Sequence, residues 1–224
     1  MKLTASDITV LVCVHSVAEW NDTSLNIAIQ SLIRQDIEDF KILIVLDNCW
    51  ERTKISVEKV LTPDITVIQK NNREGKQGLA FAKNFGLKHI NTKLVAFLDA
   101  DDEYLPDKLE QQLTYLNKHP ETDFLGTHAY YRNVTDLSRL ETSLFDVNTY
   151  NHHDDIRAVI SSENVLTHGS MMIRMQALEK LGGYRHVKGA EDWDLWQRAF
   201  EAGFRFAQIN ERLYIYTVNT SVER

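Results

Sequence analysis

The feature that most constrains the fold is a regular exchange of strand-like and helix-like segments along the first half of the chain. Short apolar runs typical of buried strands alternate with longer segments in which apolar residues recur every three or four positions. The expected strands cover residues 8–14, 40–46, 64–69 and 93–98, and the expected helices cover 24–34, 78–90 and 106–117. Because strands separated by helices pair in parallel, the sequence predicts an α/β fold with a mainly parallel sheet.

The pattern changes near residue 122. A strand-like segment, 124–131, precedes a polar and aromatic stretch from 132 to 164, in which we expect a long functional loop. Regularity then returns, with a strand expected over 170–173, helices over 176–181 and 191–202, and strand-like segments around Phe206 and Tyr214. With 224 residues and no linker, the chain fits a single domain, 1–224, made of two halves.

Charge and apolar content exclude some partners. The net charge of -7 leaves no excess of basic residues to neutralise phosphates, so we expect no nucleic acid partner. The longest apolar stretch near the start covers residues 8–14, far short of the roughly 20 residues of a membrane span, and it does not form a signal peptide. Cys13 and Cys49 each end a strand-like run and are expected to be free thiols. These features predict a cytoplasmic protein.

Three carboxylates follow the expected strand over 93–98. Asp99, Asp101 and Asp102 stand where a parallel strand emerges at its carboxyl end, the edge at which open α/β sheets bind ligands. Like charges about 4 Å apart repel by roughly 4 kcal/mol at an effective dielectric near 20, so the cluster favours a bound cation. Oxygen ligands indicate Mg²⁺ or Mn²⁺. The alternative is that Asp99 or Asp102 only caps the following turn or helix.

Together with this acidic cluster, several segments resemble the inverting GT-A glycosyltransferases of family 2. The resemblance covers nearly the whole chain and rests on residues 10–16, 31–35, 41–48, 78–86, 97–102, 168–174, 181–184 and 191–198. An Asp-x-Asp motif alone is weak evidence. The same motif followed in order by a Gly-Gly-Tyr turn and a helix that begins Glu-Asp is specific.

The chain departs from the family pattern at a few positions. His15 and Ser16 replace an aromatic residue and an asparagine, and Leu46 replaces the first of two aspartates. Lys83 replaces the usual arginine of its helix, and Thr217 stands where a tyrosine-arginine pair is common. These departures leave the contact with the nucleotide base open, and the role of the missing arginine must be absent or filled by another residue.

The resemblance implies a fold, a reaction and a cofactor. The fold is GT-A, a Rossmann-like mainly parallel sheet flanked by helices, with a smaller mixed sheet region on the acceptor side. The nucleotide would bind to residues 1–121 and the acceptor to residues 122–224. The reaction is transfer of a sugar, with inversion, from a nucleotide diphosphate sugar, expected to be a UDP-sugar, to a saccharide or glycan acceptor. The cofactor is Mn²⁺ or Mg²⁺, and the setting is the synthesis of surface polysaccharides or glycans.

The resemblance also implies site residues. Asp192, beside Glu191, would be the catalytic base, and Asp101 with Asp99 would hold the metal. Nucleotide-binding roles fall on Val14, His15, Ser16, Glu19, Asp47, Asn48, Lys83, Asp99 and Ala100, with Asp47 expected to accept a hydrogen bond from the base. Sugar or acceptor roles fall on Trp193, His168 and Gly169.

Some of these residues have ordinary structural alternatives. Glu191 and Asp192 could simply be acids at a helix start, and the indoles of Trp193 and Trp196 could both pack in the core. His168 could contact the acceptor or be a hydrogen-bonded structural histidine. The His152-His153 pair could belong to a second metal site or to an exposed acceptor loop.

Three other classes of protein share part of this pattern. In phosphatases with a nucleophilic aspartate, the Asp-x-Asp motif follows the first strand, whereas here it follows the fourth. Nucleotidyltransferases open with a glycine-rich basic loop, and residues 12–20 contain neither glycine nor arginine. A nucleotide-sugar-binding module that has lost turnover is the remaining alternative, and it is favoured only by the departures at positions 15, 16, 46 and 217.

Overall fold

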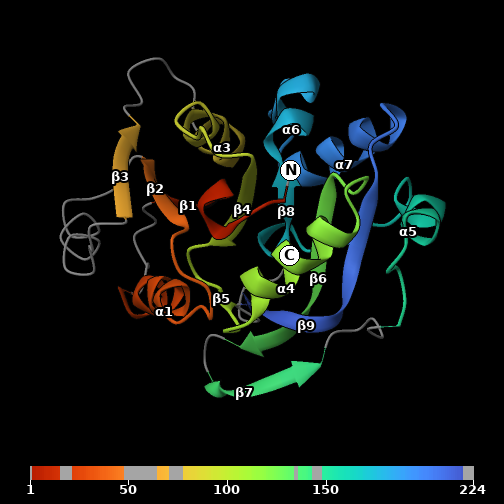
Figure 1. Ribbon diagram of the computed structural model, residues 1–224. Coiled ribbons are helices and arrows are strands. Elements are labelled where there is room, and N and C mark those ends of the chain that lie inside the picture. Colours follow the sequence, from red (N-terminus) through yellow and green to blue (C-terminus); the bar gives the residue numbers. More distant parts are fainter. Residues whose placement is uncertain are drawn as a thin grey trace.

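A computed structural model describes residues 2–15, 22–47, 65–70, 78–133, 136–142 and 148–218 (Figure 1). Within these residues one sheet holds its strands in the order β3-β2-β1-β4-β8-β6-β9-β5, and β7 pairs with β6. The strands are β1 (Ile8–His15), β2 (Lys41–Asp47), β3 (Ile65–Lys70), β4 (Leu94–Asp99), β5 (Glu103–Tyr104), β6 (Phe124–Asn133), β7 (Asp136–Thr142), β8 (Met172–Arg174) and β9 (Phe206–Val218). The helices are α1 (Asp22–Ile33), α3 (Leu79–Leu87), α4 (Lys108–Lys118), α5 (His153–Val159), α6 (Met175–Leu181) and α7 (Glu191–Glu201), with short 3₁₀ turns η1 (Ala5–Asp7) and η2 (His168–Ser170).

The first four strands form the expected parallel part of the sheet. β1 pairs in parallel with both β2 and β4, and β2 pairs in parallel with β3. The register places His15 beside Asp47 and Cys13 beside Asp99. The carboxyl ends of β1, β2 and β4 therefore meet at one edge, and the α/β prediction is confirmed.

The second half continues the same sheet rather than forming a separate one. β8 is antiparallel to both β4 and β6, and β6 then pairs in parallel with β9 over its whole length, with register shifts around His128. The two strand-like segments expected around Phe206 and Tyr214 are one strand, β9. The short β5, which the sequence did not indicate, pairs with β9 and is the last strand at that edge of the sheet.

The expectation of a long loop over residues 132–164 is wrong in part. β6 runs on to Asn133, β7 covers Asp136–Thr142, and α5 covers His153–Val159. Neither β7 nor α5 has a clear signal in the sequence. Within the described residues β7 pairs with β6 alone and is mostly polar, and α5 buries only Ile156. An element that buries so little apolar surface leaves no clear periodicity.

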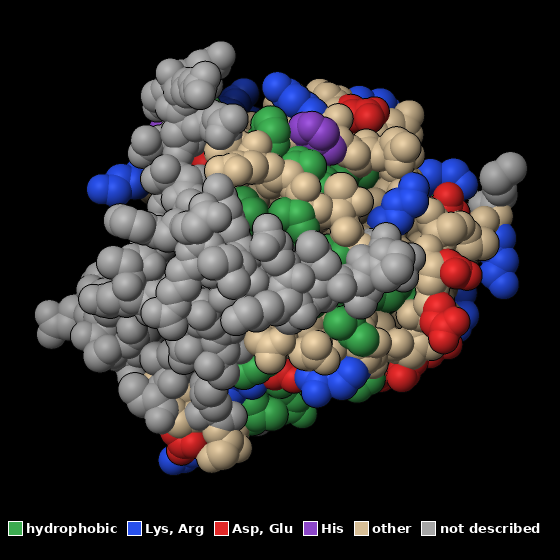
Figure 2. Space-filling model, turned by 90° about the vertical axis from the view of Figure 1, so that its left-hand side faces the viewer, with side chains coloured by type: hydrophobic (Ala, Val, Ile, Leu, Met, Phe, Trp, Pro, Cys, Tyr) green, Lys and Arg blue, Asp and Glu red, His purple; other side chains and the backbone are tan. Residues whose placement is uncertain are grey.

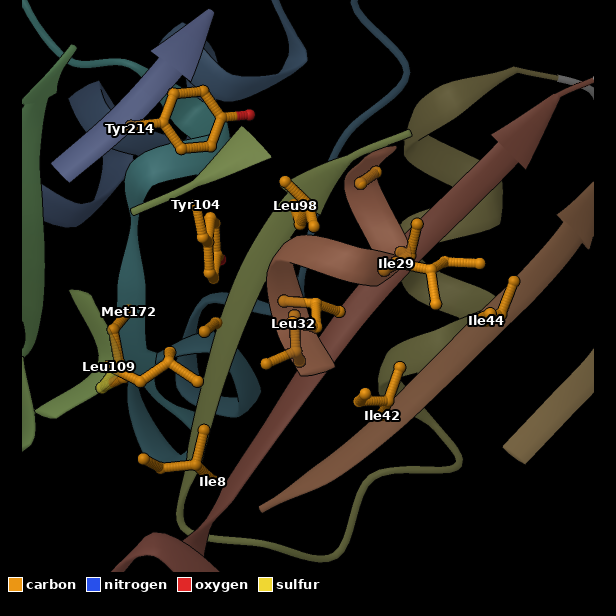
Figure 3. Close-up of a cluster of buried hydrophobic side chains, with 14 of the residues drawn as sticks. Ile8, Ile29, Leu32, Ile42, Ile44, Leu98, Tyr104, Leu109, Met172 and Tyr214 are labelled. Carbon is orange, nitrogen blue, oxygen red and sulfur yellow. The ribbon is translucent and has the colours of Figure 1, made fainter. Parts of the chain in front are cut away.

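Successive strand residues point to opposite faces of the sheet and build two cores. Val10, Val12 and Ile44 pack with α1 and α4 on one face, and Figure 3 shows part of this cluster. Leu11 and Val45 pack with α3, α6 and α7 on the other. Figure 1 accordingly shows helices on both sides of the sheet. Of the helices in the described residues, none is long and apolar enough to cross a membrane.

Candidate active site

A cavity of about 450 Å³ lies where the two halves of the sheet meet. Five of the predicted site residues line it together: Lys83 of α3, Asp99 at the end of β4, His168 of η2, and Glu191 and Asp192 at the start of α7. The acidic motif at residues 99–102 and the acidic motif at residues 191–194, far apart in sequence, therefore face one space. The parallel sheet places the first motif at the cavity, and the packing of α7 against the sheet places the second motif there.

Asp99 is the carboxylate of the first motif that faces this cavity. Burial raises the pKa of Asp99 to about 6; the Lys83 ammonium opposes this rise, and the carboxylates of Asp101, Asp192 and Glu191 add to it. A carboxylate placed among other carboxylates is stabilised in its ionised form by any nearby positive charge.

Lys83 joins the two halves of the site through an ion pair. Its Nζ lies 3.0 Å from Glu191 Oε1, and the side chains are 3% and 14% exposed. The same ammonium lies 5.1 Å from the centre of the Tyr184 ring. The structure thus places the Lys83 charge on Glu191, so α3 is connected directly to the start of α7.

Both carboxylate oxygens of Asp192 accept hydrogen bonds. The backbone N–H of Trp193 donates to Oδ1 at 2.7 Å, and the Asn164 side chain donates to Oδ2 at 3.2 Å. Asp192 lies in the first turn of α7, where the positive end of the helix dipole favours an ionised carboxylate. Since Asp192 lines the cavity, its carboxylate could take a proton from a group bound there.

The three aspartates after β4 have different environments. Asp102 is 1% exposed and binds β9, accepting hydrogen bonds from the Tyr214 hydroxyl at 2.5 Å and the Thr217 N–H at 2.6 Å. Burial, together with the charges of Asp99 and Asp101, raises the pKa of Asp102 well above its usual value. Asp101 is exposed. The structural alternative therefore holds for Asp102, and Asp99 and Asp101 are the carboxylates available to a ligand.

A divalent cation fits this pair only with help from a ligand. Among the described residues no group of three or more His, Cys, Asp and Glu side chains could hold a metal by itself. Mg²⁺, however, is usually bound by one or two carboxylates together with substrate phosphates and water. Asp99 and Asp101 match that donor set, and the unfavourable burial of Asp99 among other acids is what a cation would relieve.

The predicted nucleotide residues are placed only in part. Asp47, at the end of β2, is buried and lies 2.9 Å from Lys70 Nζ on β3, an ion pair that the sequence did not indicate. Val14 and Ala100 are buried. His15 is placed by its backbone pairing alone. The predicted residues Ser16, Glu19 and Asn48 lie outside the described part of the chain.

The two tryptophans of α7 pack inward. The Trp193 indole N–H donates to the Ile160 carbonyl at 2.5 Å. Trp196 is fully buried, with its ring edge-on to Phe124 and Phe206. Both indoles therefore pack in or against the core, as in the structural alternative, and Trp193 does not line the cavity.

His168 lines the cavity and, together with Gly169, packs in the core beside it. The His168 Nε2 lies 2.8 Å from the Tyr184 hydroxyl, and the ring is packed against Phe97 and Trp196. Burial, reinforced by the charge of Lys83, lowers the pKa of His168 well below its usual value, so the ring is neutral. Gly169 lies against Tyr214, and a methyl group on it would overlap the tyrosine hydroxyl.

His153, a candidate for a second metal site from the sequence, is also a packing residue. Its ring stacks on Phe200 at 5.0 Å, and its Nδ1 accepts the backbone N–H of Phe206 at 3.2 Å. Desolvation, together with the charge of Arg205, lowers the pKa of His153. The neutral ring joins α5 to the start of β9.

Another wall of the cavity comes from residues that the sequence did not reveal. His128 and Tyr131 of β6, Gln208 and Tyr216 of β9, and Asn164 line it. Tyr131 and Tyr216 are register partners, with ring centres 5.6 Å apart and nearly perpendicular. Only the pairing of β6 with β9 brings them together, so no signal along the sequence could have found the pair.

An arginine from another strand lies beside Thr217, a position at which the chain departs from the family pattern. Arg132 is the register partner of Thr217 on β6, and its Nη2 donates to Thr217 Oγ1 at 3.2 Å. The other end of the guanidinium, Nη1, donates to Glu103 at 2.7 Å. A guanidinium therefore lies beside this position even though β9 itself does not supply it.

A larger cavity, about 890 Å³, lies between α3 and α6 beside the end of β3. Phe81, Phe85 and Leu178 give it a mainly apolar wall, and neither acidic motif lines it. Figure 2 views the molecule from the β3 side, where hydrophobic side chains show between polar ones. The chemistry described above is concentrated in the smaller cavity.

A parallel sheet with one acidic motif at its carboxyl edge, faced by a second acidic motif at a helix start, defines an α/β protein of the GT-A type. The sequence profile of glycosyl transferase family 2 matches residues 9–182. The chain therefore belongs to glycosyl transferase family 2, which confirms the predicted family and, at the level of the family, the predicted class of enzyme, EC 2.4.

Similar proteins agree with this assignment. The uncharacterized glycosyltransferase MJ1057 of Methanocaldococcus jannaschii is 27% identical over 85% of this chain and 64% of its own length. The O-antigen biosynthesis glycosyltransferase WbnJ of Escherichia coli is 26% identical over 95% of this chain and 80% of its own. The amylovoran biosynthesis glycosyltransferase AmsE of Erwinia amylovora is 26% identical over 85% and 69%. The chain thus spans about two thirds of the length of two of these relatives.

Solved structures share the fold. S. aureus TarS has a TM-score of 0.73 at 20% identity, covering 97% of this chain and 37% of TarS. The mannosyltransferase PcManGT of Pyrobaculum calidifontis, solved with GDP-Man and Mn²⁺, has a TM-score of 0.70 at 17% identity, covering 96% of this chain and 57% of its own. TarS 1–349 has also been solved with UDP-GlcNAc. At these identities the likeness confirms the fold class.

Proposed function

We propose that this protein transfers a sugar, with inversion, from a nucleotide diphosphate sugar to a hydroxyl of a saccharide or glycan acceptor. The observation that carries the proposal is the single cavity lined by Asp99, Lys83, Glu191 and Asp192. Inverting transfer needs a base on one side of the anomeric carbon and a stabilised leaving diphosphate on the other. Two acidic motifs that face one space supply both.

In this proposal the halves of the chain have separate tasks. Residues 1–121 bind the nucleotide, with Asp47 near the base and Asp99 near the ribose or the metal. Residues 122–224 bind the acceptor, with the wall that contains Tyr131 and Tyr216 as the surface for a sugar ring. Aromatic rings beside hydrogen-bonding side chains are suited to a ligand with one apolar face and several hydroxyls. Asp192 takes the proton of the acceptor hydroxyl as the new bond to the anomeric carbon forms.

We propose Asp101 and Asp99 as the residues that hold Mn²⁺ or Mg²⁺. When bound, the ion would neutralise charge on the departing diphosphate. The mannosyltransferase solved with GDP-Man and Mn²⁺ supports a divalent ion in this fold, and TarS 1–349 solved with UDP-GlcNAc supports a UDP-sugar. The names of WbnJ and AmsE support a place in polysaccharide synthesis.

Calorimetric titration tests the donor site. UDP, GDP and dTDP are titrated with and without Mn²⁺ into the native protein and into Asp101→Ala. Binding of one nucleotide that requires both Mn²⁺ and Asp101 is the expected result. If no nucleotide shows metal-dependent binding, the proposal fails. If a nucleotide sugar binds but is neither hydrolysed nor transferred, the protein is a binding module without turnover.

A further inference from the structure

Asn164 makes a contact that none of the sequence motifs indicates. Its Nδ2 donates to Asp192 Oδ2 at 3.2 Å, while its Oδ1 accepts the backbone N–H of Leu166 at 3.3 Å. A backbone N–H can only donate, so the atom that faces Leu166 must be the amide oxygen. The NH₂ group of Asn164 is therefore turned toward the Asp192 carboxylate.

The segment around Asn164 is held firmly against the body of the protein. Val165 and Leu166 are 7% and 4% exposed and pack in the core beneath α7. Four residues before Asn164, the Ile160 carbonyl accepts the indole N–H of Trp193 at 2.5 Å. The segment thus contacts α7 twice, at the Trp193 ring and at the Asp192 carboxylate. Because this backbone is anchored, Asn164 can orient Asp192 at little entropic cost.

Asp192 lies among side chains of the same charge. Asp99 on β4 and Glu191 on α7 line the same cavity, and both repel an ionised carboxylate. The Lys83 ammonium on α3 is bonded to Glu191, and the neighbouring rings of His168 and Tyr184 are buried, with His168 neutral. Among the described residues, Asn164 therefore supplies the side-chain donor to Asp192. Together with the Trp193 N–H, it holds both carboxylate oxygens.

We propose that Asn164 is a positioning residue for sugar transfer, holding the Asp192 carboxylate in the orientation that receives the acceptor proton. The inference rests on the proposed function. In the step concerned, the acceptor oxygen forms a bond to the anomeric carbon and its proton passes to Asp192. The bond from that carbon to the diphosphate oxygen breaks, and its electron pair leaves with the phosphate.

Asn164→Leu is the informative variant. It is similar in size and uncharged, and it removes the donating NH₂ group, so Asp192 loses its donor without gaining a like charge beside it. UDP-GlcNAc, UDP-glucose and GDP-mannose are screened with Mn²⁺, and the steady-state release of nucleotide is followed for the donor that the native protein turns over. We expect kcat to fall about 10- to 100-fold, the range found when residues that orient metal ligands are replaced, with KM unchanged.

The same substitution in an Asp192→Asn background tests whether Asn164 acts through Asp192. There we expect a change in kcat of less than about twofold, because residues that act as a unit are not additive. A native kcat in Asn164→Leu would overturn the proposal. So would a raised KM at unchanged kcat, which would mean that Asn164 contacts the substrate, or an equal loss in both backgrounds.

A structural measurement separates this inference from the proposed function. If the native protein turns over none of the donors, the proposed function fails, and crystal structures of the native protein and of Asn164→Leu decide the positioning role. Asp192 displaced or in several rotamers in Asn164→Leu supports the inference. The same single rotamer in both structures overturns it.

Discussion

The acidic motif after β4 and the acidic motif at the start of α7 divide their carboxylates in the same way. In the first, Asp102 is bound to β9 while Asp99 faces the cavity. In the second, Asp194 binds Arg198 at 2.7 Å while Asp192 faces the cavity. Each motif therefore joins one carboxylate that holds the fold to another that is open to chemistry. The sequence of a motif does not show which carboxylate has the structural role and which faces the cavity.

The two motifs differ in how deeply the structural carboxylate is buried. Asp102 is 1% exposed and binds two buried groups of β9, whereas the Asp194 side chain keeps 20% exposure beside Arg198. Removing the first leaves buried partners without an acceptor, and removing the second leaves partners that water can reach. Replacing the structural carboxylate should therefore destabilise the protein more in the motif after β4 than in the motif of α7, and this difference can be tested.

The largest expected effect is on catalysis, from Asp192→Asn. Loss of a general base lowers kcat by about 10² to 10⁴, while binding of nucleotide with Mn²⁺ should be unchanged. The matched control is Asp194→Asn on the same helix, which should keep the native kcat and lose no more than about 1 kcal/mol of unfolding free energy. Steady-state kinetics and calorimetry measure both. An Asp194→Asn variant as inactive as Asp192→Asn would break the division proposed for α7.

Next comes Asp102→Ala, which should lower the free energy of unfolding by about 2–4 kcal/mol. The Tyr214 hydroxyl and the Thr217 N–H would each lose an acceptor in the protein interior, and an unsatisfied buried group costs about 1–3 kcal/mol. Urea denaturation measures the loss. Asp101→Ala, one residue away and exposed, should stay within about 0.5 kcal/mol of the native protein. Equal losses in the two variants would contradict the assignment of Asp102 to the fold.

Lys83→Met should cost about 2 kcal/mol of stability and lower kcat/KM. Breaking a buried ion pair costs about 3–5 kcal/mol, and the remaining exposure of Glu191 reduces this here. Lys83→Arg keeps the positive charge and should recover most of the stability. Urea denaturation and kinetics of the two variants measure the difference. If Lys83→Met were as stable as the native protein, the link between α3 and α7 would be unimportant.

The smallest expected effect, about 1–2 kcal/mol, is that of Gly169→Ala. The added methyl group would overlap the Tyr214 hydroxyl and push it away from Asp102. The cost should shrink in an Asp102→Ala background, because the hydroxyl is then no longer held in place. Urea denaturation of the native protein, the two single variants and the double variant gives the coupling energy. A coupling of zero would show that Gly169 and Asp102 act independently.

The parallel half of the protein could be predicted because each of its signals is local. The runs that became β1, β2 and β4 are apolar enough to be buried on both faces, and the Asp-x-Asp motif follows directly from the end of β4. The same holds for α7, which begins at the predicted Glu191. Elements with weak local signals were missed: β5 because it is only two residues long, β7 because its sequence is mostly polar, and α5 because it buries only Ile156.

The sequence by itself determined the fold class, the family and the two acidic motifs, because these depend on patterns within short segments. Only the tertiary structure decided the roles inside the motifs. It turned Asp102 toward Tyr214, placed Lys83 on Glu191, and brought Asn164 to Asp192. It also set Tyr131 beside Tyr216 and Arg132 beside Thr217 through the register of β6 and β9. Burial and hydrogen-bond partners are properties of the packed chain, and residues far apart in sequence acquire them only when the sheet has formed.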